Sequence, residues 1–298
     1  MIHVRPDAEG VTDAALRVVK AVLSGRARRG AGPVRLVLSG GRTPQALYRR
    51  LSLCGEDEVP WSRLQLFWGD ERCVSKTDPR SNYGMVRAAG LLDRPLRGVY
   101  AMPGELPPPE GALQYERDLR AVFPDGSPCF DLTILGLGAD GHIASLLPGS
   151  SDLAATDRWV VATEEYQGTR RLSLTLPVLA SSCHVLFLVT GEDKAEAVRA
   201  VLGGASAAGG SPSPARALLD LIGARAEAAR ASAIPRPKVS WLLDEAAAGP
   251  PTTLGPSAAA GPSAGAVAVP SLDGVPRRRY GTGVDTSPVK TETHGPRQ

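Results

Sequence analysis

Four short segments of the chain combine glycine with charged or hydroxyl-bearing side chains, and each follows a run typical of a buried strand. They are residues 39–44, 69–72, 136–142 and 191–194. Glycine lets the backbone approach a ligand closely, and the free amides at the start of a helix attract anions. Histidine titrates near neutral pH and transfers protons. These residue types predict a site that holds an anion, most naturally a phosphate, beside an acid–base group.

The first segment, Ser-Gly-Gly-Arg-Thr-Pro, lies between an expected strand and an expected helix. We predict that Thr43 caps the helix and that Pro44 takes its first position. Gly40 and Gly41 would then expose backbone amides to a phosphate, with Arg42 and the Thr43 hydroxyl as further donors. An ordinary capped turn is the alternative, and this segment alone leaves both interpretations open.

Charged side chains also leave the ends of other expected strands. Asp70 and Arg72 follow one strand, and Asn82 lies in the Ser-Asn-Tyr sequence that comes next. A solvated, salt-bridged turn is the alternative here, but the expected position at the ligand-binding sheet edge favours function. Lys194 falls in the first turn of a predicted helix, where the helix dipole disfavours a cation. A bound anion would resolve that conflict, and Arg171, beside a strand start, is a further cation.

The third segment contains the pattern G-x-G-x-x-G at Gly136, Gly138 and Gly141. A dinucleotide site would need a full crossover helix next and an acidic residue at the end of the following strand. Pro148 follows too soon for such a helix, and the acidic residue Asp157 precedes the next expected strand instead of ending it. We therefore reject the dinucleotide interpretation. The loop instead presents His142 at a strand end. The other histidines are near the N-terminus, in an apolar strand and in the C-terminal region, at His3, His184 and His294.

Apolar strand-like runs alternate with helix-like segments through most of the chain, which predicts an α/β fold with a largely parallel sheet buried on both faces. Strands are expected at residues 34–38, 64–68, 131–135, 159–163, 171–176, 184–189 and 239–243. Helices are expected at residues 44–51, 82–92, 111–122, 193–202 and 216–231. Ligands of such sheets bind at the carboxyl ends of the strands, where the four segments lie.

Composition limits the class of protein. With 298 residues, 43% of them hydrophobic, the chain can form a real core, so a wholly disordered protein is excluded. A formal net charge of +3 implies no extended nucleic-acid surface. Residues 249–298 are rich in glycine and proline, and we expect a disordered tail behind a catalytic domain at residues 1–248. The tail is an inert appendage or, as the alternative, a weak docking segment.

The cysteines and the apolar runs indicate where the protein acts. The four cysteines form no C-x-x-C pair and have no histidine cluster beside them, so we expect reduced thiols and no metal site; they are Cys54, Cys73, Cys129 and Cys183. No apolar run is long enough for a signal peptide or a bilayer span. We therefore expect a cytoplasmic protein that binds no membrane and, given its near-balanced charge, no nucleic acid. A monomer is the default expectation, because the sequence carries no signal of the oligomeric state.

Taken together and in order, these motifs resemble those of the 6-phosphogluconolactonases, in the wider family that includes glucosamine-6-phosphate deaminase. The resemblance extends over residues 1–248 and adds Ala144-Ser145-Leu146 with Pro148 and the stretch at 171–179. It implies a Rossmann-like fold with helices on both sheet faces, no cofactor and no metal. It also implies hydrolysis of 6-phospho-D-glucono-1,5-lactone, a phosphorylated sugar lactone, in the oxidative pentose phosphate pathway.

The resemblance also implies roles for individual residues. Catalytic roles fall to His142, as general acid or base, and to Asp70 and Arg72. Asp70 would orient either the imidazole or Arg72, and Arg72 with backbone amides of the 136–142 loop would stabilise the oxyanion. Contacts to the phosphate and substrate are expected from Gly40, Gly41, Arg42, Thr43, Asn82, Gly138, Asp140, Gly141, Arg171 and Lys194. Arg42 departs from the small polar residue common at this position.

Two other functions fit the same residues. A deaminase and isomerase of the same family would usually carry Asn-Glu-Pro after the catalytic histidine, and here the sequence reads Ser145-Leu146-Leu147-Pro148. A non-catalytic sugar-phosphate sensor would normally add a DNA-reading module, and none precedes residue 34. The presence of His142 and Arg72 also favours an enzyme.

Overall fold

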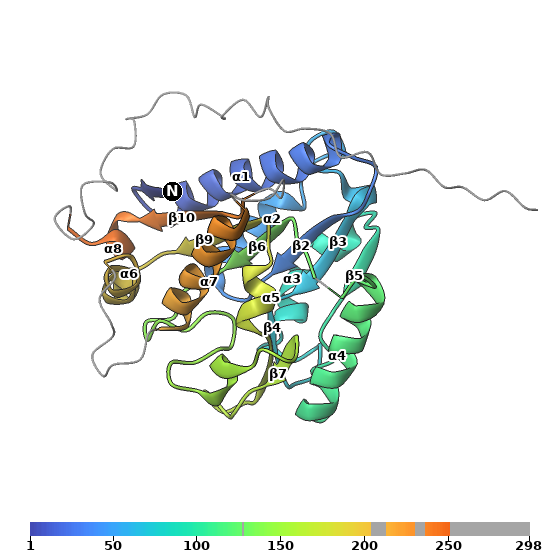
Figure 1. Cartoon of the computed structure of the whole chain (residues 1–298). Helices are drawn as coiled ribbons and strands as arrows, with labels where there is room; N and C mark the ends of the chain where they lie inside the picture. The colour runs from blue at the N-terminus through green and yellow to red at the C-terminus, as the bar shows by residue number, and fades with distance from the viewer. Residues whose placement is uncertain (127, 204–212, 230–235, 251–298) are drawn as a thin grey trace, which may run out of the picture. The chain divides into compact units, whose positions relative to one another are not determined.

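The central strands are apolar on both faces, as strands between two helical layers must be. The computed structural model describes residues 1–126, 128–203, 213–229 and 236–250. One sheet has seven strands in the order β1 (Ile2–Arg5), β10 (Lys238–Asp244), β9 (His184–Val189), β6 (Leu132–Leu135), β2 (Val34–Leu38), β3 (Leu64–Trp68) and β5 (Gly98–Tyr100). Each neighbouring pair is parallel, so the predicted α/β fold is confirmed (Figure 1).

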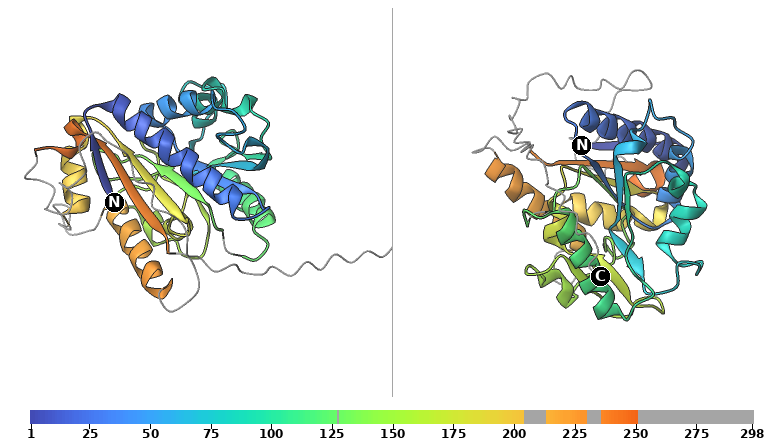
Figure 2. Two further views of the ribbon diagram at one scale, coloured as in Figure 1. Left: turned by 90° about the horizontal axis from the view of Figure 1, so that it is seen from above. Right: turned by 90° about the vertical axis from the view of Figure 1, so that its right-hand side faces the viewer.

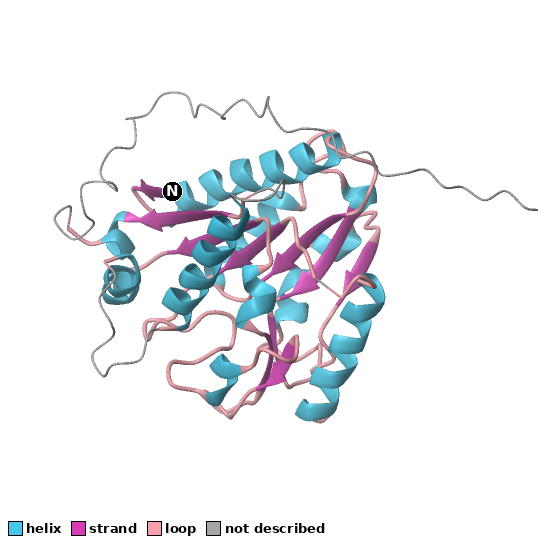
Figure 3. Ribbon diagram, in the orientation of Figure 1, coloured by secondary structure: helices cyan, strands magenta, loops and turns pink. Residues whose placement is uncertain are grey.

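Helices cover both faces of this sheet. On one face α1 (Ala8–Arg28) packs against α2 (Arg42–Leu51), and on the other α5 (Leu176–Ala180) packs against α7 (Pro214–Ala228) (Figures 1 and 2). Further α-helices of the described chain are α3 (Asn82–Ala88), α4 (Pro108–Val122), α6 (Ala195–Leu202) and α8 (Glu245–Ala248). Figure 3 shows the strands enclosed by these helices. No helix among the described residues is long and apolar enough to cross a bilayer.

Three short strands form a second, antiparallel sheet in the order β4 (Asp70–Arg72), β8 (Arg171–Leu174) and β7 (Val160–Ala162). The sequence predicts β7 and β8 but not their separation from the main sheet, and it treats β4 as a loop. The reason is that β4 is only three residues long and fully polar, so it carries no apolar period. Its pairing with β8 has a direct consequence for the site, because Arg72 lies opposite Arg171.

The first two elements, β1 and α1, were not predicted. Helix α1 shows the helical period in its buried residues, among them Val11, Ala15 and Val19. The Asp7 side chain caps it by accepting a hydrogen bond from the Gly10 amide at 2.8 Å. The predicted tail, residues 249–298, lies outside the described part of the chain except for its first two residues.

Helix α2 begins two residues before the predicted position, and Thr43 is not its cap. The N-cap is Gly41, whose φ of 110° is open to glycine at little cost, and no side chain caps the helix. The Thr43 hydroxyl is instead 2.7 Å from the hydroxyl of Thr190. Pro44 still lies in the first turn, where its missing N–H leaves no intrahelical bond unmade. A similar correction applies to the helix predicted at 82–92, which ends at Ala88.

The segments that follow β2, β3, β6 and β9 meet at one edge because the strands are parallel. This arrangement brings together four loops from distant parts of the sequence, as predicted. Cross-links between the loops hold the edge in place. The Gly69 amide donates to the carbonyl of Leu38 at 2.8 Å, and the Asp244 carboxylate accepts from the Gly191 amide at 3.0 Å.

One buried histidine makes the stability of this sheet depend on pH. His184 lies in β9 with its Nε2 2.9 Å from Ser240 Oγ, and burial lowers its pKa to about 4. The unfolded chain takes up a proton below about pH 6.5 while the folded chain stays neutral. Stability is therefore lost as the pH falls from 6.5 towards 4, by about 2 kcal/mol between pH 7 and pH 5. Urea unfolding of the wild type and of His184→Gln at both pH values checks this. An equal loss in the variant would contradict it.

Candidate active site

A pocket of about 760 Å³ opens at the carboxyl edge of the main sheet. Its lining includes ten of the thirteen site residues predicted from sequence, namely Gly40, Gly41, Arg42, Thr43, Asp70, Arg72, Gly138, His142, Arg171 and Lys194. The other three, Asn82, Asp140 and Gly141, are not part of the lining. All three instead hydrogen-bond residues that are, so the structure gives them a supporting position.

His142 is held by Asp140 rather than by Asp70. Its Nδ1 is 2.6 Å from Asp140 Oδ1, and its backbone N–H donates to the same oxygen at 3.1 Å. Burial tends to raise the pKa of Asp140, but the hydrogen bonds and charge of His142 outweigh it and hold that pKa below its ordinary value. An ionised carboxylate only accepts, so Nδ1 carries the proton. The lone pair is then on Nε2, the nitrogen that can take a proton from a ligand.

The backbone of the 136–142 loop leaves room for this imidazole. A Cβ placed on Gly138 would overlap the His142 ring, whereas one placed on Gly136 would meet nothing within 4 Å. Gly141 has a φ of 84° and donates its amide to the Gly138 carbonyl at 3.0 Å. Ala144 has a φ of 48°, an uncommon value for a residue with a Cβ, and it lines the pocket.

Asp70 contacts a serine and an asparagine instead of the imidazole. Ser145 Oγ donates to Asp70 Oδ2 at 2.7 Å, and Asn82 Nδ2 lies 2.9 Å from the Asp70 carbonyl and 3.4 Å from Oδ1. Asp70 and its two partners are all buried. This network fixes the carboxylate at the pocket wall. In the described chain Asp70 is hydrogen-bonded to Ser145 and Asn82, and to neither of the two groups that the sequence offered, the imidazole and Arg72.

Glu71 has a structural role next to this network. Its carboxylate accepts hydrogen bonds from the backbone amides of Arg72, Asn82 and Tyr83 at 2.7–2.8 Å. Burial raises the pKa of Glu71, and these three amide bonds oppose that rise. The carboxylate thus satisfies amides at the start of α3, so the Asp-Glu-Arg triplet is not the salt-bridged turn weighed as the alternative.

Arg72 and Arg171 bring two positive charges to one side of the pocket. They are direct partners in the antiparallel pair of β4 and β8, and each has a buried Nε without a hydrogen-bond partner. Within the described chain neither guanidinium forms an ion pair with a carboxylate. Burial lowers the pKa of Arg171, and the charge of Arg72 lowers it further. Like charges opposite each other destabilise a sheet, so the arrangement favours a bound anion.

Tyr166 connects His142 with Arg171, and no pattern in the sequence points to it. Its ring lies edge-on to the His142 ring with centroids 5.7 Å apart, and the Arg171 guanidinium sits 5.0 Å from its centroid. Its hydroxyl is 3.5 Å from Asp140 Oδ2, a long contact. The residue lies in the turn between β7 and β8, and only the folded hairpin brings it next to His142 and Arg171, which line the pocket. A lone tyrosine in a polar segment gives no sequence signal of this position.

The contacts of Tyr166 predict different effects for two substitutions. Tyr166→Phe keeps the ring and removes only the hydroxyl. We expect kcat/KM for hydrolysis of the phosphorylated lactone within about threefold of the wild type, because the 3.5 Å contact of the hydroxyl with Asp140 contributes little. Tyr166→Ala removes the packing on both neighbours, and we expect kcat/KM to fall about tenfold. Steady-state kinetics on both variants checks this, and equal losses in the two would contradict the role of the ring.

The 191–194 loop supplies a further cation. Lys194 precedes α6 as its N-cap residue, and its Nζ is 3.0 Å from Asp193 Oδ2. The predicted conflict with the helix dipole is thus partly relieved by a neighbouring carboxylate. Gly191 has a φ of 101° and forms the turn that brings both side chains to the pocket. Thr190, which also lines the pocket, ties this loop to α2 through Thr43.

The donor set of the pocket suits an anionic organic ligand rather than a metal. Among the residues that the structure describes, no group of three or more His, Cys, Asp or Glu side chains is arranged to hold a metal ion. The pocket instead combines cations, glycine-rich backbone and one histidine whose Nε2 has no hydrogen-bond partner among the described residues. Such a site can bind a phosphate or carboxylate and move one proton.

Comparisons with known proteins agree on one family. A family model described as glucosamine-6-phosphate isomerases/6-phosphogluconolactonase matches residues 6–223. A 6-phosphogluconolactonase from Synechocystis is 39% identical over 188 residues, 61% of this chain and 74% of that protein. One from Mycobacterium tuberculosis is 38% identical over 218 residues, 68% of this chain and 86% of the relative. The solved structure of a Trypanosoma brucei 6-phosphogluconolactonase matches with a TM-score of 0.68 and 26% identity, covering 83% of this chain and 97% of that one.

Proposed function

The chain belongs to the glucosamine-6-phosphate isomerase/6-phosphogluconolactonase family, and from this premise we propose that it hydrolyses 6-phospho-D-glucono-1,5-lactone to 6-phosphogluconate. The observation that carries the proposal is the juxtaposition of Arg72 and Arg171, unpaired with any described carboxylate, with a histidine whose Nε2 is available as a base. Cations bind the anionic substrate and His142 performs the chemistry. A monomeric state and a cytoplasmic location stay predictions.

In the proposed mechanism, His142 Nε2 takes a proton from a water molecule, which attacks the lactone C1 carbonyl. The ring C1–O bond then breaks, and the imidazolium returns the proton to the departing ring oxygen. Asp140 stabilises the imidazolium through Nδ1 and keeps it in orientation. No serine nucleophile is needed because a lactone is already reactive.

Arg72 is the donor for the tetrahedral oxyanion in this mechanism. Three of the loop amides that the sequence offered together with Arg72 are engaged elsewhere. The Gly138 amide donates to the His142 carbonyl, Gly141 to the Gly138 carbonyl and His142 to Asp140. The Nε of Arg72 is buried and has no hydrogen-bond partner in the described chain, and Nη1 donates to the Arg80 carbonyl. Arg171, Lys194 and the amides of the 40–43 loop then hold the phosphate.

Substrate discrimination tests the proposal against the two other functions. Purified protein is given 6-phosphogluconolactone, unphosphorylated gluconolactone and glucosamine 6-phosphate in parallel. We expect acceleration of the first only. Arg72 and Arg171, the cationic wall of the pocket, select the phosphate, and the Asn-Glu-Pro sequence of the deaminases is absent after His142. Ammonia release from glucosamine 6-phosphate would instead establish the deaminase. Tight binding of the sugar phosphates without turnover of any substrate would establish a sensor.

The cationic wall predicts a large effect on substrate binding. Replacing Arg171 by Gln should raise KM for the phosphorylated lactone by about tenfold to a hundredfold, with a smaller change in kcat, because a charge-assisted contact to the anion is lost. Arg170→Gln is the matched control, because Arg170 is exposed, donates to the Thr163 carbonyl at 3.1 Å and does not line the pocket. Equal KM changes in both variants would contradict the assignment of Arg171.

A further inference from the structure

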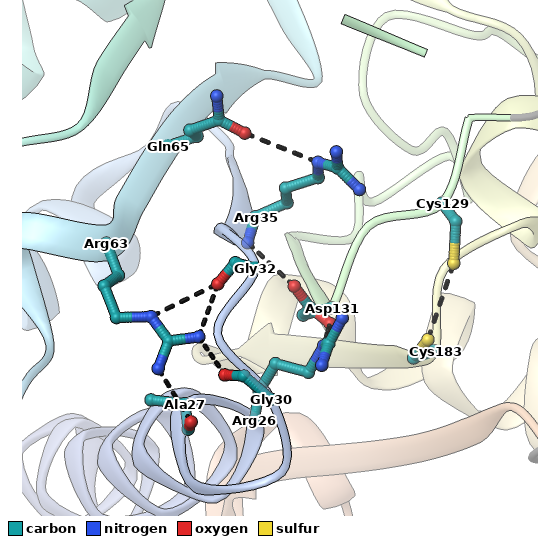
Figure 4. Close-up of polar contacts among 10 residues, drawn as sticks. All are labelled: Arg26, Ala27, Gly30, Gly32, Arg35, Arg63, Gln65, Cys129, Asp131 and Cys183. Carbon is teal, nitrogen blue, oxygen red and sulfur yellow. Dashed lines mark hydrogen bonds and ion pairs between the residues drawn. The ribbon is translucent and has the colours of Figure 1, made fainter. Parts of the chain in front are cut away.

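Two cysteine thiols lie side by side at the amino edge of the main sheet, the edge opposite the pocket. Cys129 comes shortly before β6 and Cys183 directly before β9, and their Sγ atoms are 3.6 Å apart (Figure 4). Both residues are exposed and both thiols are free. The reaction proposed above uses neither of them.

The backbone holds the two cysteines in this arrangement. The Cys183 amide donates to the Phe130 carbonyl at 2.8 Å, and Thr133 Oγ1 is 2.7 Å from Ser182 Oγ. Thr133 pairs with Val185 in the parallel register of β6 and β9, so the segments that precede these two strands lie side by side. Because Phe130 is the chain neighbour of Cys129, the bond from the Cys183 amide fixes the backbones of the two cysteines next to each other. The pairing of β6 with β9 thus brings together two thiols that are far apart in the sequence.

We propose that Cys129 and Cys183 form a peroxide-sensitive dithiol site that closes reversibly to a disulfide. The Cys129 thiolate attacks one oxygen of hydrogen peroxide, the O–O bond breaks, and the leaving hydroxide takes a proton to become water. The sulfur of Cys183 then attacks the resulting sulfenic acid, and a second water leaves with the Cys183 proton. Two thiols are oxidised by two electrons and one peroxide is reduced to two waters.

The surroundings separate the two thiols into an attacking and a resolving group. The hydrogen bond between the two thiols lowers the pKa of Cys129 against the effect of partial burial, with help from the charges of Arg225 and Arg35. The same hydrogen bond and burial raise the pKa of Cys183. Asp131 opposes the Cys129 thiolate, but its carboxylate is paired with Arg26 Nε at 2.6 Å (Figure 4). These opposite directions assign Cys129 as the attacking thiol and Cys183 as the resolving one.

The distance between the two Sγ atoms allows the disulfide to form without unfolding of the sheet. A disulfide requires sulfur atoms about 2.05 Å apart, so the two must approach by about 1.5 Å. Exposed side chains can make such a shift by changing their χ1 angles. The other two cysteines lack these features, because Cys54 is buried and burial raises the pKa of Cys73 to about 11. They are the internal controls.

The test is oxidation of the reduced full-length protein with a small excess of hydrogen peroxide, alkylation of remaining thiols, and peptide mass spectrometry. We expect one intramolecular linkage between Cys129 and Cys183, reversed by dithiothreitol, with Cys54 and Cys73 still alkylated. Cys183→Ser should stop the reaction at a sulfenic acid on Cys129 that dimedone traps. Failure to form the linkage, or a linkage only between two molecules, would overturn the proposal.

Thermal unfolding gives a second readout that does not depend on chemical trapping. The disulfide would close a loop of 54 residues and reduce the entropy of the unfolded chain, so the oxidised wild type should melt on the order of 5–10 °C higher. Dithiothreitol should remove the increase, and Cys183→Ser should not show it. An oxidised wild type that forms the linkage but melts no higher would contradict the proposal that the disulfide links the segments before β6 and β9 without straining the fold.

Discussion

Replacing His142 by Ala is expected to lower kcat for lactone hydrolysis by about 10²–10⁴-fold, with KM changed only a few-fold. The Nε2 of this residue is the one nitrogen we assign as the base, and the groups assigned to the phosphate lie on other loops. Steady-state kinetics with the spontaneous rate subtracted measures both constants. Arg171→Gln should show the opposite pattern, with a large increase in KM and a small change in kcat.

Chemical rescue distinguishes a lost base from a disturbed fold in this variant. The space left by the imidazole lies at the pocket wall, so added imidazole should restore part of the activity of His142→Ala. The same imidazole should add nothing to the wild-type rate beyond its effect on spontaneous hydrolysis. A variant with near-normal turnover would contradict the role of His142 and move the base to another residue.

The second large effect is expected from a single methyl group on the catalytic loop. Gly138→Ala places its Cβ against the His142 ring, which must then move. A displacement of about 1 Å at a reacting group can cost about a hundredfold in rate, so we expect kcat to fall by about that factor. The overlap is with the ring and with the Asp140 carboxylate that holds it, and not with the core, so the melting temperature should change much less than the rate.

Gly136→Ala is the matched control, because it adds the same methyl group to the same loop with nothing within 4 Å. We expect its kcat within about threefold of the wild type. If both variants lost activity equally, loop flexibility rather than the position of the imidazole would explain the effect. If neither lost activity, the ring position in the structure would not be the reactive one.

The positions of the site loops could be predicted from the sequence, because apolar strand runs and the glycines after them are local signals. Residues 34–38 and 184–189 are strands at the predicted bounds, and the loops that follow them do meet. The parallel order of the strands then requires the loop ends to share one edge. That requirement is why the lining of the pocket contains most of the residues predicted for it.

The partners within the site could not be predicted, because they depend on pairings between distant segments. The contact of Arg72 with Arg171 exists only through a second sheet whose strand β4 is too short and polar to show a pattern. The choice of Asp140 over Asp70 as the partner of His142 depends on the turn geometry of one loop. Helix α1 is a different case, since the period of its buried residues is a local signal that is visible in the sequence.

The most direct test of the central claim follows the lactone itself. 6-Phosphogluconolactone is generated enzymatically from glucose 6-phosphate, and phosphorus NMR records its disappearance with no protein, with the wild type and with His142→Ala. We predict that the wild type accelerates hydrolysis well above the spontaneous rate and that the variant loses most of that acceleration. Equal acceleration by both would keep the lactonase but remove His142 as its base. No acceleration by the wild type would contradict the proposed function.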